Sequence, residues 1–191
     1  TLRVITQPTP WRSNDPPHVQ TFTVTDSNTI TALADLPVVL PRPEDLRSVR
    51  FDGDRAYAIT FEQIDPLFTF DLSDPAEPKQ VGELEIPGFV VHMEPRGDRV
   101  YALGNDWDSP DGALHVSIFD VSDLAAPTML SRVNFGGDWA WVAEYQDRIH
   151  KAFNLALEQN AILVPCGGVA YADDSCSWSY QSLFQSIGEG N

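Results

Sequence analysis

The stretch RFDGDRAYAITFEQIDPLFTFDL, residues 50–72, is followed by a second version of itself, PRGDRVYALGNDWDSPDGALHVSIFDV, residues 95–121. The tripeptide GDR at 53–55 returns 44 residues later at 97–99, and each copy is followed by a short apolar segment, AYAI or VYAL. Self-similarity at a fixed period indicates a protein built from repeated structural units. This internal repeat is the feature that decides the fold.

The second half of each copy ends in a shared turn. DLSD at residues 71–74 returns 49 residues later as DVSD at 120–123. Asp and Ser in such a motif cap the backbone and end a strand, while the earlier Gly-Asp pair makes a tight turn. Between the turns lie segments rich in β-branched and aromatic residues, which favour strands. Four short strands in about 45 residues is the period of a β-propeller blade.

The rest of the chain fits the same unit less closely. A third, weaker copy is DRIHKAFNLALEQNAILVP at residues 147–165, and residues 143–158 read as strands and loop rather than as a helix. We therefore predict one all-β β-propeller segment over residues 1–191, with about four blades present, belonging to a larger propeller. The predicted blades lie near residues 48–89, 90–137 and 140–180, with 1–47 forming part of a preceding blade.

The charge of the chain limits the classes of partner that it can bind and indicates where it is located. The 28 acidic and 12 basic residues give a formal net charge of -16, which repels nucleic acids and anionic membrane surfaces. No apolar run is long enough to span a bilayer. We expect a secreted, periplasmic or cell-surface protein that meets a membrane only through a lipid anchor outside this chain, as in a lipoprotein.

The segment SVRFDGDRAYAITFEQIDPLFTFDLSDPAEPKQVGELEIPGF, residues 48–89, resembles the bacterial and archaeal family of secreted β-propeller proteins of uncharacterised activity. HKAF at 150–153, followed by AILVP at 161–165, looks like the next blade of the same family. The resemblance implies an exported or lipid-anchored propeller, and it carries no catalytic residues over to this chain. The chain departs from the family where Val90 and Val91 replace a common serine and tyrosine.

One acidic loop is a candidate metal site. Asp106, Asp108 and Asp111 precede a glycine in the sequence DWDSPDG. Calcium binds six to eight oxygens, which a tight acidic loop can gather. The pattern of a complete calcium loop is broken by Pro110. A calcium site and an ordinary inter-strand loop are the two interpretations, and no other cofactor is predicted.

Other residues suggest a cross-link and a binding surface. Cys166 and Cys176 are close in sequence, and they form either a disulfide in an oxidising compartment or two unpaired thiols. Trp107, Trp139 and Trp141 lie in predicted loops or at strand ends. Such aromatics bind a sugar ring or a protein partner, or else pack between blades.

No motif assigns a reaction to the chain. The nucleophile elbow of serine hydrolases is missing from the sequence, and so are the phosphate-binding loop and zinc-ligand spacing. His92 and His115 interrupt strand patterns and are interpreted as strand histidines with satisfied hydrogen bonds. We therefore predict a binding or scaffolding module whose loop face takes a protein or carbohydrate, joined by the remaining blades. The alternative is a secreted hydrolase that cleaves glycans or peptides in a central acidic pocket, so whether the chain is an enzyme stays open.

Overall fold

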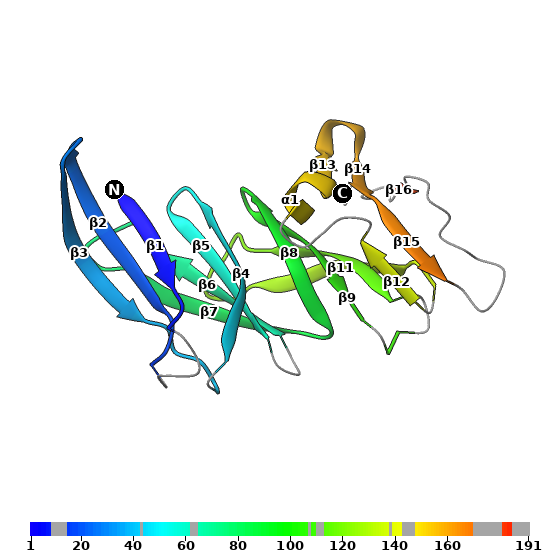
Figure 1. The fold of residues 1–191 in the computed structure, drawn as a ribbon, viewed down its shortest axis with the longest axis horizontal. Coiled ribbons are helices and arrows are strands. Elements are labelled where there is room, and N and C mark those ends of the chain that lie inside the picture. The colour runs from blue at the N-terminus through cyan, green and yellow to red at the C-terminus, as the bar shows by residue number, and fades with distance from the viewer. Residues whose placement is uncertain are drawn as a thin grey trace.

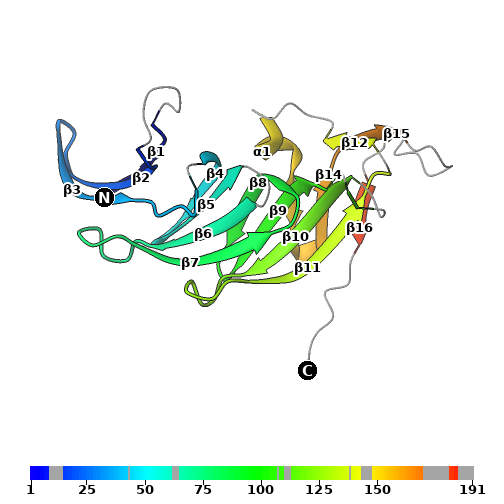
Figure 2. The same ribbon diagram turned by 90° about the horizontal axis from the view of Figure 1, so that it is seen from below.

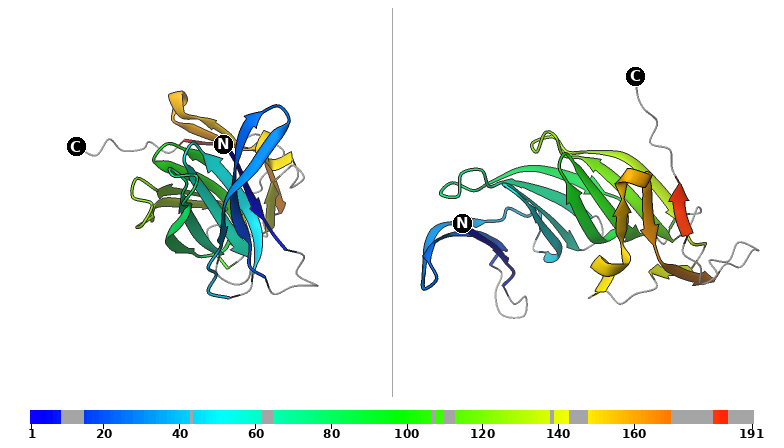
Figure 3. Two further views of the ribbon diagram at one scale, coloured as in Figure 1. Left: turned by 90° about the vertical axis from the view of Figure 1, so that its left-hand side faces the viewer. Right: turned by 90° about the horizontal axis from the view of Figure 1, so that it is seen from above.

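A computed structural model describes residues 1–8, 15–42, 44–61, 65–106, 108–109, 113–137, 139–142, 148–169 and 181–184. These residues form several antiparallel sheets that follow one another along an arc, which the right-hand view of Figure 3 shows most clearly. Two sheets have four strands each and lie in the middle of the arc (Figure 1).

The two four-stranded sheets have the same simple order, in which each strand pairs with the next along the chain. The GDR and D-x-S-D turns lie at the connections that the repeat predicts. The first sheet, called sheet B, contains β4 (Asp45–Asp52), β5 (Arg55–Phe61), β6 (Asp65–Asp71) and β7 (Lys79–Ile86). The second, sheet C, contains β8 (Phe89–Arg96), β9 (Arg99–Asn105), β10 (Leu114–Asp120) and β11 (Thr128–Phe135).

The sheet before them has three strands. Sheet A consists of β1 (Leu2–Thr6), β2 (His18–Asp26) and β3 (Thr29–Pro37), with β1 at one edge. In Figure 2, a short connection leads from sheet A to sheet B, and the long β2–β3 hairpin extends away from the other sheets.

The region after sheet C contains two small sheets. β12 (Trp139–Val142) pairs with β15 (Cys166–Val169), and β13 (Asn154–Ala156), β14 (Ala161–Val164) and β16 (Gln181–Phe184) form the other. Only Pro165 separates β14 from β15, so one extended segment serves both sheets. Between β12 and β13 lies a helix, α1 (Ile149–Ala152), and a short 3-10 turn, Leu157–Gln159, follows β13.

Helix α1 differs from the prediction of strands and loop for residues 143–158, of which 143–147 lie outside the described residues. A helix of four residues is too short to show a 3.6-residue apolar period, so the sequence pattern gives no signal for it. The same prediction excluded a long helix in this segment, and the only helical elements in its described part are α1 and the 3-10 turn, with β13 between them.

Apolar side chains fill the spaces between successive sheets. One cluster lies between sheets A and B and includes Val19, Phe68 and Phe70, all fully buried. The next joins sheets B and C, where Phe119 is fully buried. A third joins sheet C to the region after it, through Leu114 and Phe153 among others. Each sheet therefore stabilises its neighbour by burying a shared face, as blades of a propeller do.

An arginine in one sheet repeatedly binds a turn of the next sheet. Arg3 on β1 donates to the Gly53 carbonyl and to Leu72 O at 3.2 Å, and lies 2.5 Å from Asp54 Oδ1. Arg55 on β5 donates in the same way to Gly97 O at 3.4 Å, Asp98 Oδ1 at 3.0 Å and Val121 O at 3.3 Å. We call these two sets of contacts the arginine clasps.

A threonine makes a second repeated contact. Thr21 Oγ1 on β2 donates to Pro75 O at 2.5 Å, and Thr69 Oγ1 on β6 donates to Leu124 O, also at 2.5 Å. Together with the clasps, these contacts make β1 the counterpart of β5 and β2 the counterpart of β6. Sheet A therefore has no described counterpart of β4, the first strand of sheet B.

The turns have the chemistry that the repeat predicts. Gly53 and Gly97 have φ values of 56° and 61°, in the left-handed region that favours glycine. The Asp71 carboxylate accepts from the backbone N–H of Ser73 at 2.9 Å, and Asp120 accepts from that of Ser122 at 2.9 Å. These hydrogen bonds lower the pKa of both carboxyl groups, with the serine hydroxyl contributing most. The polar residues of the repeated turns thus have structural roles.

We expect Arg55→Gln to lower the free energy of unfolding by about 1 kcal/mol, because the arginine clasp is partly exposed to solvent and therefore screened. Urea unfolding followed by circular dichroism measures this change. The control is Arg99→Gln, since Arg99 pairs with Asp120 of its own sheet at 2.9 Å. Its expected effect is within about 0.5 kcal/mol, and equal losses in both variants would contradict a special role for the clasp between sheets.

Candidate functional site

A pocket of about 300 Å³ lies where two strands and a helix meet. β4 and β8, the first strands of sheets B and C, pack side by side, and α1 lies over β8 (Figure 1). The ring of Phe153, which directly follows α1, contacts the His92 ring edge-on with centroids 5.3 Å apart. The lining residues are Arg50, Phe51, Asp52, His92, Met93, Glu94, Pro95, Arg96 and His150.

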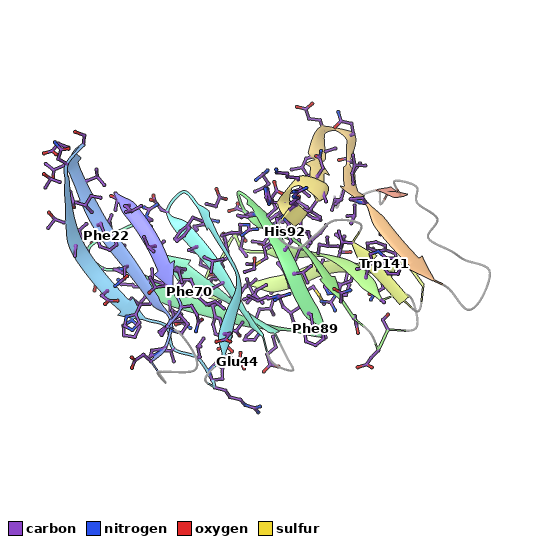
Figure 4. The ribbon with its side chains drawn as sticks, in the orientation of Figure 1. Phe22, Glu44, Phe70, Phe89, His92 and Trp141 are labelled. Atoms are coloured by element: carbon purple, nitrogen blue, oxygen red, sulfur yellow. The ribbon has the colours of Figure 1, made fainter. Side chains whose placement is uncertain are left out.

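His92 is the most deeply buried polar group of this pocket, with a side chain only 2% exposed. Figure 4 shows it on β8, beside α1. Its Nδ1 lies 3.0 Å from Arg50 Nη2. A guanidinium can only donate, so Nδ1 must accept and the hydrogen of a neutral ring must lie on Nε2.

The Nε2–H group of His92 has no hydrogen-bond partner within the described part of the chain. Glu94 Oε2 lies 3.8 Å from Nε2, which is beyond hydrogen-bond distance. Burial above all, together with the charges of Arg50 and His150, lowers the pKa of His92 to about 4. At neutral pH the ring is therefore uncharged and presents one donor.

The carboxylates of the pocket already have their own partners. Glu94 Oε1 accepts from Arg96 Nη2, and Asp52 Oδ2 accepts from the backbone N–H of Gly97 at 3.2 Å. Within the described residues, Arg50 donates to Val49 O at 2.7 Å and to His92 and has no hydrogen bond to a carboxylate. Burial lowers the pKa of Arg50, and the field of Glu94 opposes that shift. Arg50 is therefore a partly buried cation beside the pocket, and the Nε2 atom of His92 is buried within its wall.

Sheet C contains a second buried histidine, away from this pocket. His115 Nδ1 lies 3.1 Å from Ser117 Oγ, which also accepts from Arg132 Nε at 2.9 Å. Burial above all lowers the pKa of His115 to about 3. Both His115 and Ser117 are 0% exposed, so this pair cannot act on a substrate. His92 and His115 each have a hydrogen bond at Nδ1 and none at Nε2 among the described residues, so the predicted satisfied strand histidine holds for one ring nitrogen of each.

The predicted calcium loop is described only in part. Asp106 Oδ2 lies 3.8 Å from Arg132, and the Asp106 carbonyl accepts from Ser109 N–H at 3.2 Å. Asp108 lies in the turn that follows, and Asp111 falls outside the described residues. The described residues hold no group of three or more His, Cys, Asp or Glu side chains arranged to bind a metal. The calcium site stays a prediction.

Only some of the predicted binding and disulfide residues lie within the described part of the chain. Trp141 on β12 is 49% exposed, whereas Trp107 and the side chain of Trp139 fall outside the described residues. Cys166 is buried on β15, and Cys176 lies outside the described residues. The predicted disulfide and the binding role of the tryptophans therefore stay predictions.

Sequence reasoning missed the pocket itself. His92 gave a signal, because it interrupts an apolar strand, but nothing marked Arg50 or His150 as its neighbours. Those residues lie 42 and 58 positions away in the chain. The packing of β4 against β8 and the position of α1 over β8 bring them together. The predicted central pocket was acidic, whereas arginines and histidines line this one as well as carboxylates.

Successive antiparallel sheets that share buried faces, with the same turn chemistry in each, define the chain as a β-propeller protein. It belongs to the Beta propeller domain family, which matches residues 1–187. The prediction of a strand-rich fold of the β-propeller family is confirmed, and the number of blades stays a prediction.

Two archaeal proteins are similar to the chain. The uncharacterized protein MJ1554 of Methanocaldococcus jannaschii is 34% identical over 141 residues, 73% of this chain and 22% of that protein. An uncharacterized protein of Archaeoglobus fulgidus is 38% identical over 128 residues, 67% of this chain and 20% of that protein. The matched region spans about a fifth of the length of these curated relatives.

Proposed function

We propose that this chain is part of a larger β-propeller that acts as a binding module outside the cytoplasm and holds a ligand in the pocket between β4, β8 and α1. The observation that carries this proposal is the pocket of about 300 Å³, which gathers charged and imidazole side chains from β4, β8 and α1. Ligand sites in proteins are concave pockets that place a few polar groups around the ligand.

The surfaces of sheet A support the participation of further blades. β1 is an edge strand, and one face of its sheet is apolar: the register pairs Leu2 with Phe22 and Val24 with Ile30. Leu2, Val24 and Ile30 are 41%, 49% and 60% exposed. Sheets B and C each bury their corresponding apolar faces against a neighbour. A blade from another part of the polypeptide would cover this face and add a strand beside β1.

The proposed location has compositional support. The excess of carboxylates suits a soluble protein outside the cytoplasm, and the two cysteines could pair there. The described chain contains no helix with the length and apolar character needed to cross a bilayer. Intact mass spectrometry of the natural protein, recovered separately from medium, periplasm and membranes, tests this part. Recovery only from the cytoplasm would contradict it.

A hydrolase receives no support from the described residues. The buried His115–Ser117 pair is closed to substrate, and the two carboxylates of the pocket each have a hydrogen-bond partner. Binding therefore explains the pocket better than catalysis does.

Nuclear magnetic resonance of ¹⁵N-histidine-labelled protein tests the binding site, because the chain has only four histidines. We expect His92 to be a neutral Nε2–H tautomer between about pH 5.5 and 8, because its pKa is lowered to about 4. Acetate, inorganic phosphate and glucose serve as small polar probes. At least one should shift the His92 and His150 signals saturably and leave those of His18 and His115 in place. If all three probes leave every signal unchanged, the pocket is not a binding site.

A further inference from the structure

A hydrogen bond joins the first strands of sheets B and C: Arg50 Nη2 on β4 lies 3.0 Å from His92 Nδ1 on β8. We infer that this bond makes the contact between the two strands sensitive to acid, because it holds β4 against β8 while His92 is neutral and breaks when His92 takes up a proton. The inference goes beyond the proposed function, since it concerns the wall of the pocket and holds whether or not a ligand is bound. His92 is labelled in Figure 4, on β8 beside α1.

The Arg50–His92 hydrogen bond can exist only while the imidazole ring is neutral. A guanidinium group has no acceptor, so Nδ1 of His92 must accept from Arg50 through its lone pair. A protonated imidazole carries a hydrogen on both ring nitrogens, so its Nδ1–H group would point at the N–H groups of Arg50. Two donors and two positive charges would then be in contact in a site with little water, which is strongly unfavourable.

A protonated His92 ring is not stable in the surroundings that the structure gives it. The side chain is only 2% exposed, so a charge on it lacks the water that would solvate it. The Phe153 ring, directly after α1, packs edge-on against the imidazole, and the residue opposite His92 on β9 is the fully buried Leu103. Hydration of a charged ring therefore requires β4, or α1 with Phe153, to move away from β8. We call the present arrangement the closed state and the separated one the open state.

The charged groups around His92 act on its protonation in both directions. They are Arg50 and Asp52 from β4, Glu94 and Arg96 from β8 itself, and His150 from α1. Glu94 Oε2, 3.8 Å from Nε2, would attract a protonated ring, but Oε1 of the same carboxylate already accepts from Arg96. Burial, with the charges of Arg50 and His150, prevails and lowers the pKa of His92 to about 4.

The direction of the pH effect follows from the difference between the two states. In the open state His92 is solvated and has the ordinary histidine pKa of about 6.5, whereas in the closed state its pKa is about 4. The open state therefore binds the proton more tightly. The stabilising effect of the closed state is fully present above about pH 6.5 and is lost as the pH falls toward about 4. Within that range the ratio of open to closed molecules should rise up to about tenfold for each pH unit.

The second buried histidine titrates in the same direction and must be distinguished from His92. The pKa of His115 is lowered to about 3, so acid weakens sheet C there as well. His115 is bonded to Ser117 on its own strand β10, whereas the His92 bond joins two sheets. The Phe153 ring is in contact with His92, so its signals report the opening that we infer.

The test is a pH titration of the full chain by nuclear magnetic resonance, with ¹⁵N-histidine and ring-labelled phenylalanine as readouts. We expect His92 to take up its proton with a midpoint well below 6.5, and the Phe153 signals to change with the same midpoint. Arg50→Gln should raise the His92 midpoint by about one pH unit or more, because it removes both the bond and a positive charge. Lys79→Gln, which removes the same charge on β7 outside the pocket, should leave the midpoint unchanged.

A second variant keeps the test decisive if acid unfolds the whole chain. The side-chain amide of His92→Gln can accept from Arg50 and does not titrate, so this variant should unfold at a lower pH than the unaltered chain. His18→Gln, which replaces a histidine on β2, should unfold at the same pH as the unaltered chain. The inference is wrong if His92 titrates near its ordinary pKa, if the Phe153 signals stay constant while His92 is protonated, or if His92→Gln has the acid stability of the unaltered chain.

Discussion

Gly104→Ala is expected to destabilise the protein by about 3 kcal/mol or more, because overpacking at a site with rigid neighbours forces the backbone to move. A Cβ atom added at Gly104 on β9 would lie 1.9 Å from the Phe89 carbonyl oxygen and 2.5 Å from His115 Nε2. The carbonyl belongs to the neighbouring strand β8, and the imidazole ring is fully buried. Neither group can give way without separating strands of sheet C.

The measurement is urea unfolding, with the heat-induced transition as a second readout. Gly97→Ala is the matched control, since a Cβ there meets no atom within 4 Å and the residue has a φ of 61°. The strain of a left-handed alanine should cost about 1 kcal/mol. A loss at Gly104 no larger than the loss at Gly97 would show that the close approach of Phe89 and His115 is unimportant for stability.

Phe119→Ala should lower the free energy of unfolding by about 3–5 kcal/mol, the range for removing a fully buried phenylalanine ring. Phe119 on β10 is 0% exposed and belongs to the cluster between sheets B and C. Phe70, 49 residues earlier, occupies the matching place between sheets A and B. The ring therefore links two sheets rather than stabilising one alone.

Hydrogen exchange locates the effect of Phe119→Ala. Amides of β6 and β10 should lose protection, because the variant weakens the contact between their sheets. Phe119→Leu keeps most of the apolar volume and should cost about 1 kcal/mol. A loss of protection confined to β10, with β6 unchanged, would contradict the role of Phe119 as a link between sheets.

The sequence predicts the two four-stranded sheets because the repeat is visible in the turns. The Gly-Asp turns at Gly53 and Gly97 need positive φ, and the carboxylates of Asp71 and Asp120 cap the backbone two residues on. These are local effects, so a residue and its near neighbours suffice to infer them. The three-stranded sheet A was harder to predict, because its turns do not repeat the motif.

The candidate site depends on contacts between distant segments. Arg50, His92 and His150 come from three different segments, and no local pattern shows that they meet. The arginine clasps are a related case. The arginine after each Gly-Asp pair is visible as part of the GDR motif, but its partner is the Gly-Asp turn of the following copy. Aligning the copies compares equivalent positions and does not reveal bonds from one copy to the next.

The arginine clasps also determine how the protein would respond to a pulling force. Each clasp joins a sheet only to the one that follows it, so the links act in series along the chain. Under tension applied at the two ends, the weakest link opens first and the remaining sheets keep their structure. The expected force trace is therefore a succession of separate rupture events, one for each sheet, instead of a single cooperative collapse.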